Sequence, residues 1–430
     1  MKTILASLLL LATLPVTVPA ADKNTESELT VHLQMRPRAE YRNGALAPHS
    51  STDQAAAFIN NRTRLTLSYQ TQGLSMGLAL QNAGVWGQDV QVSRNPNTNV
   101  YEAWAQLTSP GGWFLKAGRQ VLAYDDERIL GALDWNPAGR SHDLLKGGFE
   151  DKTHKLHLAL AYNQNTEKVI GGTYYATAQP YKTMQMLWYQ YNGSPVIKPS
   201  FLLMNLGIEI GSAVTGRSEV AAMQTIGTHW VTQPTDHLGV NLSAYYQLGK
   251  TRTNATIEAW MMALQANLAI GRKWTATAGT DFLSGEETIN NNATYNAFNP
   301  LYGTHHKFYG AMDYFYASAF RANLNPGLWD SYAGLTHQAS KNLTLSAKYH
   351  YFAITSDIND NGRVLKRGLG SEIDLQFDWT IRKEVRLSGG YSTMLGSASM
   401  DIVKGPSHTV WQDWGWISIN FNPRILSLKH

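Results

Sequence analysis

The stretch Asn60–Leu80, NNRTRLTLSYQTQGLSMGLAL, decides the fold, because its residues alternate in polarity on both sides of a tight turn. Successive residues of a strand point to opposite faces, so Leu65 and Leu67 share one face and Arg62 and Arg64 share the other. In a soluble β-protein the leucines would face the core and the arginines the water. In a transmembrane β-barrel the leucines would face lipid and the arginines an aqueous lumen. The hairpin alone fits both.

The start of the chain has the features of a secretory signal peptide. Lys2 supplies a positive charge, and an apolar run covers Ile4–Leu14 before a stretch of small residues. We therefore predict that residues 1–20 are a signal peptide, cleaved after Ala20 or Ala21. An N-terminal anchor helix is the alternative, but the apolar run is too short to cross a bilayer. Beyond this segment no run approaches the roughly 18 apolar residues of a transmembrane helix.

The amino-acid composition favours a transmembrane β-barrel, whose strands separate lipid from water. Only 16% of the residues are charged, against about a quarter in ordinary soluble proteins, whereas the chain has 21 Tyr and 13 Trp. The mean hydropathy of −0.28 shows that apolar and polar residues are interleaved. With no cysteine, burial and hydrogen bonds alone must stabilise the fold. A net charge of +4, without a nucleic-acid motif, does not indicate nucleic-acid binding.

Alternation of period two predicts about eighteen strands in residues 21–430, most of them near the ten or so residues that a tilted transmembrane strand needs. The first covers residues 29–41 and the last 413–421, and these two must pair because lipid tolerates no open strand edge. The long connections that alternate with short turns are 123–141, 164–183, 285–326, 353–366 and 396–412. The fold class is therefore all-β: a transmembrane antiparallel β-barrel of the bacterial outer membrane, with short periplasmic turns and long extracellular loops.

Aromatic residues gather beside the predicted turns, among them Trp274, Trp379 and Tyr391. In a soluble sandwich each ring would belong to the core. At the ends of transmembrane strands the same rings would form the interfacial girdle, where an amphipathic ring is most stable.

Longer blocks resemble a known family. They are RTRL at Arg62–Leu65, AGRQVLAYDDERILGALDWNPAGRSHD at Ala117–Asp143, SGEE followed by FNPLYGTHHKFYGAMDYFY at Phe298–Tyr316, and LGSEID at Leu369–Asp374. On these blocks the chain resembles the alginate-export family of outer-membrane porins. The resemblance implies a monomeric barrel of eighteen strands, with a lumen rich in arginine and lysine, that passes an anionic polysaccharide outward.

The face opposite the lipid carries charged residues that we expect to line the substrate path. They are Arg36, Arg38, Arg62, Arg64, Lys116, Lys348 and Arg386, with Arg119, Arg128 and Arg140 near the connection 123–141, and the acids Glu102, Asp281 and Asp374. Arginine matches carboxylates bidentately and stays charged, and a low-dielectric wall concentrates anions in the pore.

The same face also carries Glu40, Glu209, Asp330, Glu372 and Asp378. Two readings stay open: a net-positive selectivity zone, or a neutralised network of ion pairs that satisfies buried charges. Strict alternation from Trp113 points Arg119 outward, and only a β-bulge near Gly118 would turn it inward.

The connection 285–326 is too long for an ordinary loop. Left in water, its aromatic block would form a large apolar patch, so we expect it to fold into the lumen as a constriction or gate. An ordered extracellular cap is the alternative. The candidate gate residues are Phe298, Tyr302, Lys307, Tyr309 and Asp313. The adjacent His305 and His306 lack further ligands at a spacing that would indicate a metal.

Asp357, Asn359 and Asn361, followed by Gly362, match the first part of a calcium-binding loop. The twelfth position, where a bidentate Glu belongs, is Gly368. We therefore expect an Asn-Gly turn and no metal, with calcium as the weaker reading.

The function expected from these features is a passive channel, anion-selective, for export or diffusion of an alginate-like polysaccharide or oligosaccharide. The expected partners are outer-membrane lipid, anionic polysaccharide or small anions, and periplasmic proteins that assist export. No cofactor is expected. A general diffusion porin for small neutral or charged solutes is the alternative. An outer-membrane enzyme or adhesin is disfavoured, because H-E-x-x-H and P-loop motifs are absent from the sequence.

Overall fold

The computed structural model describes residues 26–92, 97–164, 166–167, 169, 181–212, 217–287, 293–405 and 407–429. The expected signal peptide, residues 1–20, lies outside the described residues. Within the described part, none of the helices has the length and hydropathy needed to cross a membrane.

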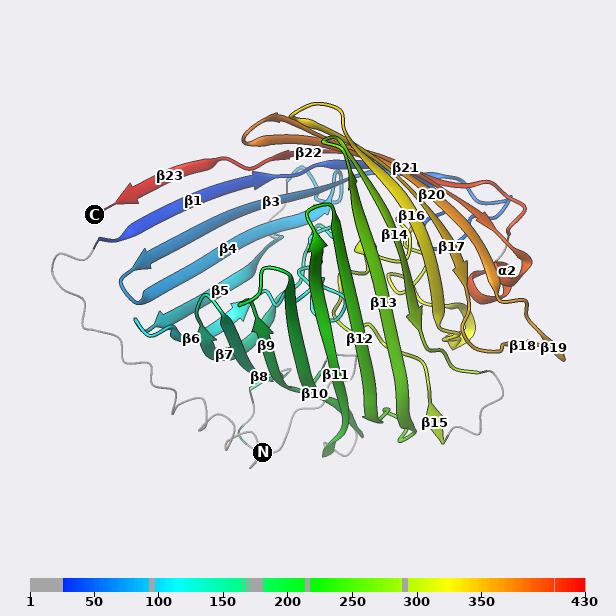
Figure 1. Cartoon of the computed structure of the whole chain (residues 1–430), viewed down its shortest axis with the longest axis horizontal. Helices are drawn as coiled ribbons and strands as arrows, with labels where there is room; N and C mark the ends of the chain where they lie inside the picture. Colours follow the sequence, from blue (N-terminus) through cyan, green and yellow to red (C-terminus); the bar gives the residue numbers. More distant parts are fainter. Residues whose placement is uncertain are drawn as a thin grey trace.

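Eighteen antiparallel strands form one closed barrel (Figure 1). Two of them are interrupted, so that β1 with β2 and β22 with β23 each count as one strand of the wall. In chain order the wall consists of β1 (Glu28–Met35), β2 (Arg38–Asn43), β3 (Ala56–Thr71), β4 (Leu74–Val85), β5 (Thr98–Thr108), β6 (Trp113–Gln120), β7 (His142–Glu150), β8 (His154–Tyr162), β9 (Thr183–Tyr191), β10 (Ile197–Ser212), β11 (Arg217–Thr235), β12 (Leu238–Lys250), β13 (Thr256–Ile270), β14 (Trp274–Leu283), β16 (Leu328–Gln338), β17 (Leu343–Ala353), β20 (Gly368–Arg382), β21 (Val385–Gly396), β22 (Gln412–Phe421) and β23 (Arg424–Lys429).

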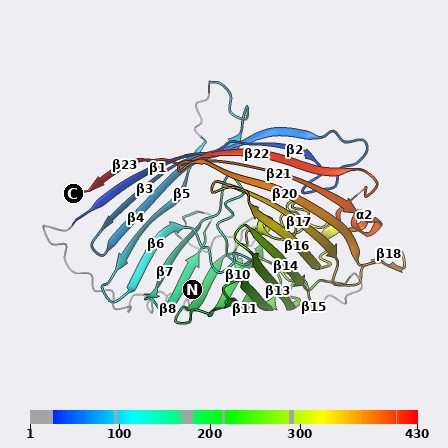
Figure 2. The ribbon, with the colours of Figure 1, turned by 45° about the horizontal axis from the view of Figure 1, so that its top comes forward.

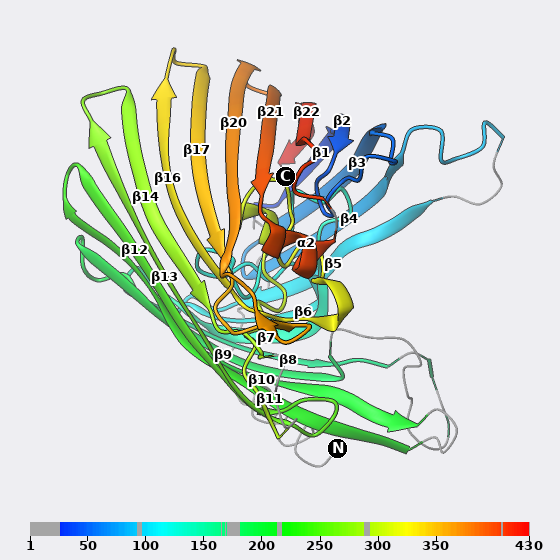
Figure 3. The same cartoon turned by 90° about the vertical axis from the view of Figure 1, so that its right-hand side faces the viewer.

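Short elements lie in the long loops on one side of the barrel. They are β15 (Thr294–Tyr295), η1 (His305–Lys307), η2 (Arg321–Asn323), β18 (Asn359–Asp360), β19 (Arg363–Val364) and α2 (Ala398–Lys404). The other side carries only tight turns, and Figure 3 shows these two ends of the barrel in profile. The predicted alternation of short turns with long loops is therefore confirmed.

The barrel closes where its first and last strands meet. Met35 pairs with Phe421, and Arg38 pairs with Ser418, so the predicted contact between residues 29–41 and 413–421 is confirmed. Figure 2 shows β22 beside β2 and β23 beside β1. Closure leaves no strand edge open to lipid.

The last strand extends further than expected. The prediction ended it at Phe421, but β23 continues the wall, and Leu29 pairs with Leu428. Pro423 has no backbone N–H to donate and breaks the alternation, which is why the sequence pattern ended early. Its carbonyl still accepts a hydrogen bond of 3.1 Å from the backbone N–H of Leu33. Residues 424–429 are therefore part of the wall.

Side chains of β13 show how the wall divides lipid from lumen. Trp260 and Met262 are exposed on the outer face, whereas Ile257, Ala259 and Met261 are buried on the inner face. The inner face is apolar here, in contrast to the polar lumen expected of a water-filled barrel. The reason is that the long loops pack against it, so that wall and loop side chains share one apolar cluster. Figures 1 and 3 show these loops within the ring of strands.

Candidate functional site

Residues 121–141, which we call the crossing loop, connect two sides of the wall across the lumen. At one side, Asp125 Oδ1 accepts a hydrogen bond of 2.6 Å from Ser200 Oγ in β10. At the other side, Gln81 Nε2 in β4 donates to the carbonyl of Ala138 at 2.6 Å. Because β4 and β10 lie far apart around the barrel, the loop must run through its interior.

A buried ion pair anchors the crossing loop to β14. Arg128 donates from its two terminal nitrogens to the carboxylate of Asp281, at 2.7 and 3.0 Å, and from Nε to Asp126 at 2.8 Å. The side chains of Arg128 and Asp281 are only 3% and 1% exposed. The guanidinium also lies 3.9 Å from the ring centroid of Phe308. Arg128 is thus bound by two carboxylates. It stabilises the packing of the loop against the wall and does not line an open path.

The connection 285–326, called the long loop from here on, interlocks with the crossing loop. The backbone N–H of Tyr302 donates to Ile129 O at 3.0 Å, and Gly131 N–H donates to Tyr302 O at 2.9 Å. Arg140 donates to the same Tyr302 carbonyl and so reaches no carboxylate there. The two loops therefore form one body.

The candidate gate residues of the long loop are mostly buried among these contacts. Phe298 and Tyr309 are 2% and 1% exposed and belong to the apolar cluster shared with the wall. Lys307 Nζ donates to the carbonyl of Asp126 at 3.0 Å. Asp313 Oδ2 lies 2.9 Å from His306 Nδ1.

Contacts with the wall hold the long loop at two further places. Met312 N–H donates to Glu372 Oε1 in β20 at 2.8 Å. Gln247 in β12 donates to the carbonyl of Asn299 at 2.7 Å and accepts from its N–H at 2.9 Å. The loop thus reaches strands on both sides of β14.

Asp134 of the crossing loop binds two arginines of the wall. Arg36 and Arg62 approach its two carboxylate oxygens at 3.0 and 2.8 Å. Burial alone would raise the pKa of Asp134, but the charges of Arg62 and then Arg36 more than offset it and hold this pKa below the usual 3.8. One carboxylate is thus shared by two guanidinium groups.

Three more arginines complete this part of the inner face. Arg38 and Arg42 both bind Glu40, at 2.9 and 2.8 Å. Arg64 donates to the amide oxygen of Gln81 at 2.7 Å and stacks 3.6 Å from the ring centroid of Tyr101. We call the five arginines of β1–β3 the basic wall: Arg36, Arg38, Arg42, Arg62 and Arg64. Their carboxylate partners among the described residues are Glu40 and Asp134.

The structure places the other expected path residues apart from the basic wall. Lys116 lies 3.5 Å from the ring of Trp104, and Lys348 lies 5.4 Å from that of Tyr332. Glu102 accepts a hydrogen bond of 3.2 Å from Val121 N–H.

Asp374 lies 3.6 Å from His350 Nε2. Arg386 is exposed near the start of β21, where it pairs in register with Asn420 of β22.

Arg119 does not join the inward arginines, and its expected place in the lumen is wrong. It continues the alternation of β6 on the exposed side, next to Asp143, and the two side chains are 39% and 64% exposed. Gly118 has a positive φ of 118°, but the register with β5 and β7 runs on without a shift. Arg119 therefore points outward, as strict alternation along β6 predicts.

The calcium-loop candidate forms a hairpin between β18 and β19. Asn359 Oδ1 accepts from the N–H of Gly362 at 2.9 Å, and Asn361 has a positive φ of 50°, as an Asn-Gly turn requires. Asp357 instead binds Arg367 at 2.8 Å. In the described part of the chain, no three His, Cys, Asp or Glu side chains are grouped to hold a metal.

Two chambers lie along the lumen, and Trp135 and His306 line both. The loop-side chamber, of about 650 Å³, also contains Arg38, Arg42 and Arg140. The turn-side chamber, of about 490 Å³, is lined instead by Glu127, Asp134, Lys307, Lys348 and Asp374. The rings of Trp135 and His306 are stacked with centroids 4.0 Å apart. This stacked pair therefore lies between the two chambers.

Sequence reasoning missed Asp134, Trp135 and His306 as central residues of the lumen. All three lie in loops, where no two-residue period shows which wall a side chain will reach. The DWNP sequence at Asp134–Pro137 was part of a recognised block, but its contact with Arg36 and Arg62 depends on the closed barrel.

The fold and the lumen define the class of protein: a porin-like channel of the bacterial outer membrane. Solved structures support this fold. OccAB4 of Acinetobacter baumannii matches with a TM-score of 0.60 and 10% identity, over 96% of this chain and 100% of that one. A BenF-like porin from Pseudomonas fluorescens matches with a TM-score of 0.60 and 12% identity, over 92% and 99% of the two chains. Pseudomonas aeruginosa OpdK matches with a TM-score of 0.59 and 10% identity, over 94% and 99%.

The chain belongs to the alginate export family, whose model matches residues 24–396. No curated protein matches the sequence. The family match confirms the resemblance that the sequence blocks indicated. The matched family and structures are those of export proteins and porins, and none points to an enzyme.

Proposed function

We propose that this channel is anion-selective and passes an anionic oligosaccharide or polysaccharide of the alginate type, a polyuronate. The observation that carries the proposal is the excess of guanidinium groups on the basic wall, where four arginines share two carboxylates and Arg64 binds an amide oxygen instead. Guanidinium groups stay charged at any working pH. In a lumen with low-dielectric walls, such an excess concentrates anions and repels cations.

The stacked pair Trp135 and His306 would be the narrowest part of the path. On its loop side, Arg38, Arg42 and Arg140 would bind a carboxylate of the cargo. On its turn side, Lys307 and Lys348 line the chamber together with the acidic residues Glu127, Asp134 and Asp374. An extended polyuronate would thus meet cationic groups on both sides of the constriction formed by the crossing loop and the long loop.

The path has no visible source of energy. Transport would follow the concentration of the cargo or the action of periplasmic partners. Because one barrel encloses its own lumen, the unit of transport would be the monomer.

A general diffusion porin is the second candidate, favoured by acids elsewhere in the barrel interior. Arg128 is bound by two of them, Asp126 and Asp281. Asp330 and Glu372 are also buried. If these carboxylates offset the basic wall, small neutral and charged solutes would pass alike.

Current block in a planar bilayer tests the cargo class. Oligomannuronate and a neutral glucan oligomer of equal length are added to the purified channel. The proposal expects the uronate to block at a lower concentration, and less strongly in the Arg64→Gln variant. Equal block by the two oligomers would support the general porin instead.

A further inference from the structure

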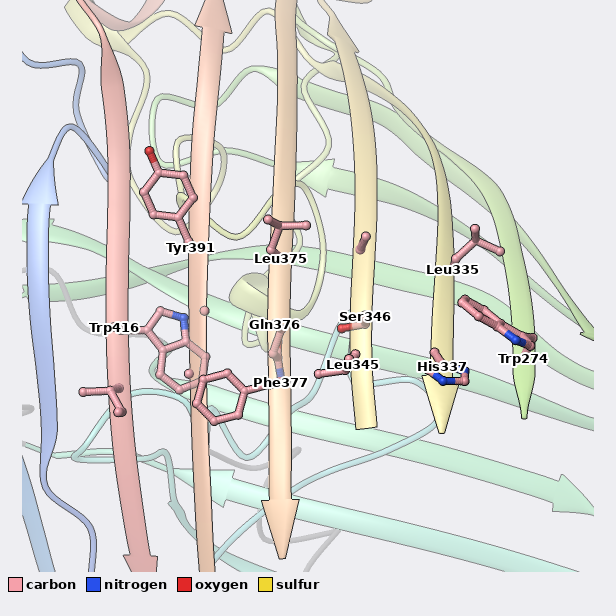
Figure 4. A pocket seen from close by; sticks show the side chains of 14 residues that line it. Trp274, Leu335, His337, Leu345, Ser346, Leu375, Gln376, Phe377, Tyr391 and Trp416 are labelled. Atoms are coloured by element: carbon pink, nitrogen blue, oxygen red, sulfur yellow. The ribbon is translucent and has the colours of Figure 1, made fainter. Parts of the chain in front are cut away.

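The outer face of β14–β22 is hollowed near the turns. A groove of about 650 Å³ runs across these strands, and Figure 4 shows the side chains that line it. Paired positions form its turn-side row: Trp274 pairs with His337, His337 with Leu345, Leu345 with Phe377, and Phe377 with Gly389. The groove therefore follows one register line around the barrel.

Small residues in neighbouring strands open the hollow. Gly389 has no side chain, and the ring of Phe377 lies so close that a Cβ at Gly389 would be 2.5 Å from it. In the next row Ala347 stands between Leu335 and Leu375, which are 50% and 49% exposed. Large apolar side chains thus flank a floor of small ones, on the face that contacts lipid tails.

Basic residues gather on the turns directly below this groove. Arg272 and Lys273 precede β14, and Lys341 lies between β16 and β17. Arg382 ends β20 and Lys383 follows it, and all five residues are exposed. Of these five basic residues, only Arg382 has an ion-pair partner within the described part of the chain, Glu384 at 2.9 Å.

Turns elsewhere on the barrel differ. The turns at 72–73, 109–112 and 192–196 carry no charged residue. The turn at 151–153 carries Lys152 but also Asp151, so the turns with a net positive charge are those of the strands that form the groove.

We propose that this face binds an anionic phospholipid of the periplasmic leaflet. An acyl chain would lie in the groove, and the basic turns would hold the headgroup phosphate. Trp274 directly follows Lys273, so its indole stands where acyl chain and headgroup meet, the position that Trp favours in membranes. Clustered lysines and arginines at a membrane surface attract anionic lipids. A zwitterionic lipid would make the same apolar contact in the groove, but its headgroup has no net charge for the basic turns to attract.

Retained lipids counted by native mass spectrometry test this. The purified full chain is reconstituted with equal amounts of phosphatidylglycerol and phosphatidylcholine bearing the same acyl chains, then transferred to detergent. The site predicts preferential retention of phosphatidylglycerol. The Lys341→Gln/Lys383→Gln variant should lose about tenfold in that retention. The matched control Lys152→Gln/Lys198→Gln removes one lysine from the turn at 151–153 and one from the start of β10, and it should retain the lipid.

The groove is tested separately by Ala347→Trp, which fills the floor from the lipid side. Ala117→Trp is its control, because Ala117 is exposed on the outer face of β6, away from the groove. Far-UV circular dichroism checks that each variant is folded. Loss of phosphatidylglycerol with Ala347→Trp alone supports the site. Equal retention of the two lipids by the unsubstituted chain, or equal effects of test and control variants, would overturn it.

Discussion

The rings of Trp135 and His306 stack with their centroids 4.0 Å apart, and both residues line the loop-side and the turn-side chamber. Trp135 comes from the crossing loop and His306 from the long loop. Each loop thus contributes one ring of the stacked pair. The boundary between the two chambers is therefore formed by two segments far apart in the sequence.

Replacing Trp135 with Ala should join the two chambers. Removing the indole takes away the ring that stacks on His306, so single-channel conductance should rise. Conductance in planar bilayers measures this. Trp86→Ala is the control. Trp86 directly follows β4 and is exposed, so this substitution removes an indole that is not part of the stacked pair. Unchanged conductance in the Trp135 variant would show that the path runs elsewhere.

The Arg128 and Asp281 pair should be needed for stability. Arg128→Met leaves Asp281 buried without its charge partner, which should cost about 3–5 kcal/mol of unfolding free energy. Arg128→Met/Asp281→Leu should recover much of the loss, because no uncompensated charge remains. Urea unfolding in lipid vesicles measures both.

The exposed pair of Arg119 and Asp143 supplies the control. Removing it with Arg119→Gln should cost about 1 kcal/mol or less. A similar loss for the exposed pair and the buried pair would contradict the assignment of Arg128 as an anchor.

Selectivity should depend on acid pH through Asp134. Its pKa lies below the usual 3.8, so the carboxylate stays ionised until the pH falls through that lowered value. Protonation then frees the charges of Arg36 and Arg62 and should raise anion preference. Stability contributed by the pair is lost over the same range. In Asp134→Asn, the preference should be high already near neutral pH and should not rise further on acidification from this group. Reversal potentials measured as a function of pH test this.

A cysteine pair tests the extended closure of the barrel. The chain has no cysteine, so Leu29→Cys/Leu428→Cys introduces a single pair. These positions are paired across the seam and should cross-link on oxidation, which is seen as a shift in gel mobility. Leu29→Cys/Leu187→Cys places the second thiol in β9 and should not. Failure of the seam pair to cross-link would contradict the role of β23.

The sequence predicted the strands of the barrel wall far better than the loops packed inside the barrel. Alternation of period two located the strands and the seam because each strand must face lipid on one side and the interior on the other. It also pointed Arg119 outward correctly. Pro423 hid β23, since it breaks the pattern without ending the strand.

Contacts of the loops could not be read in the same way. The crossing loop has no period, and Asp134 meets Arg36 and Arg62 only because the barrel brings β1 and β3 beside it. The apolar inner face of β13 was equally hidden. Its Met261 is buried by loop residues whose position is set by tertiary structure.

The measurement that tests the central claim most directly is the reversal potential of the purified channel under a salt gradient. Arg64 has an amide and an aromatic ring as its partners rather than a carboxylate, so Arg64→Gln should lower the anion preference. Arg119→Gln removes the same charge from the outer face and should leave the preference unchanged. A channel without anion preference, or an equal shift in both variants, would contradict a basic wall that selects anions.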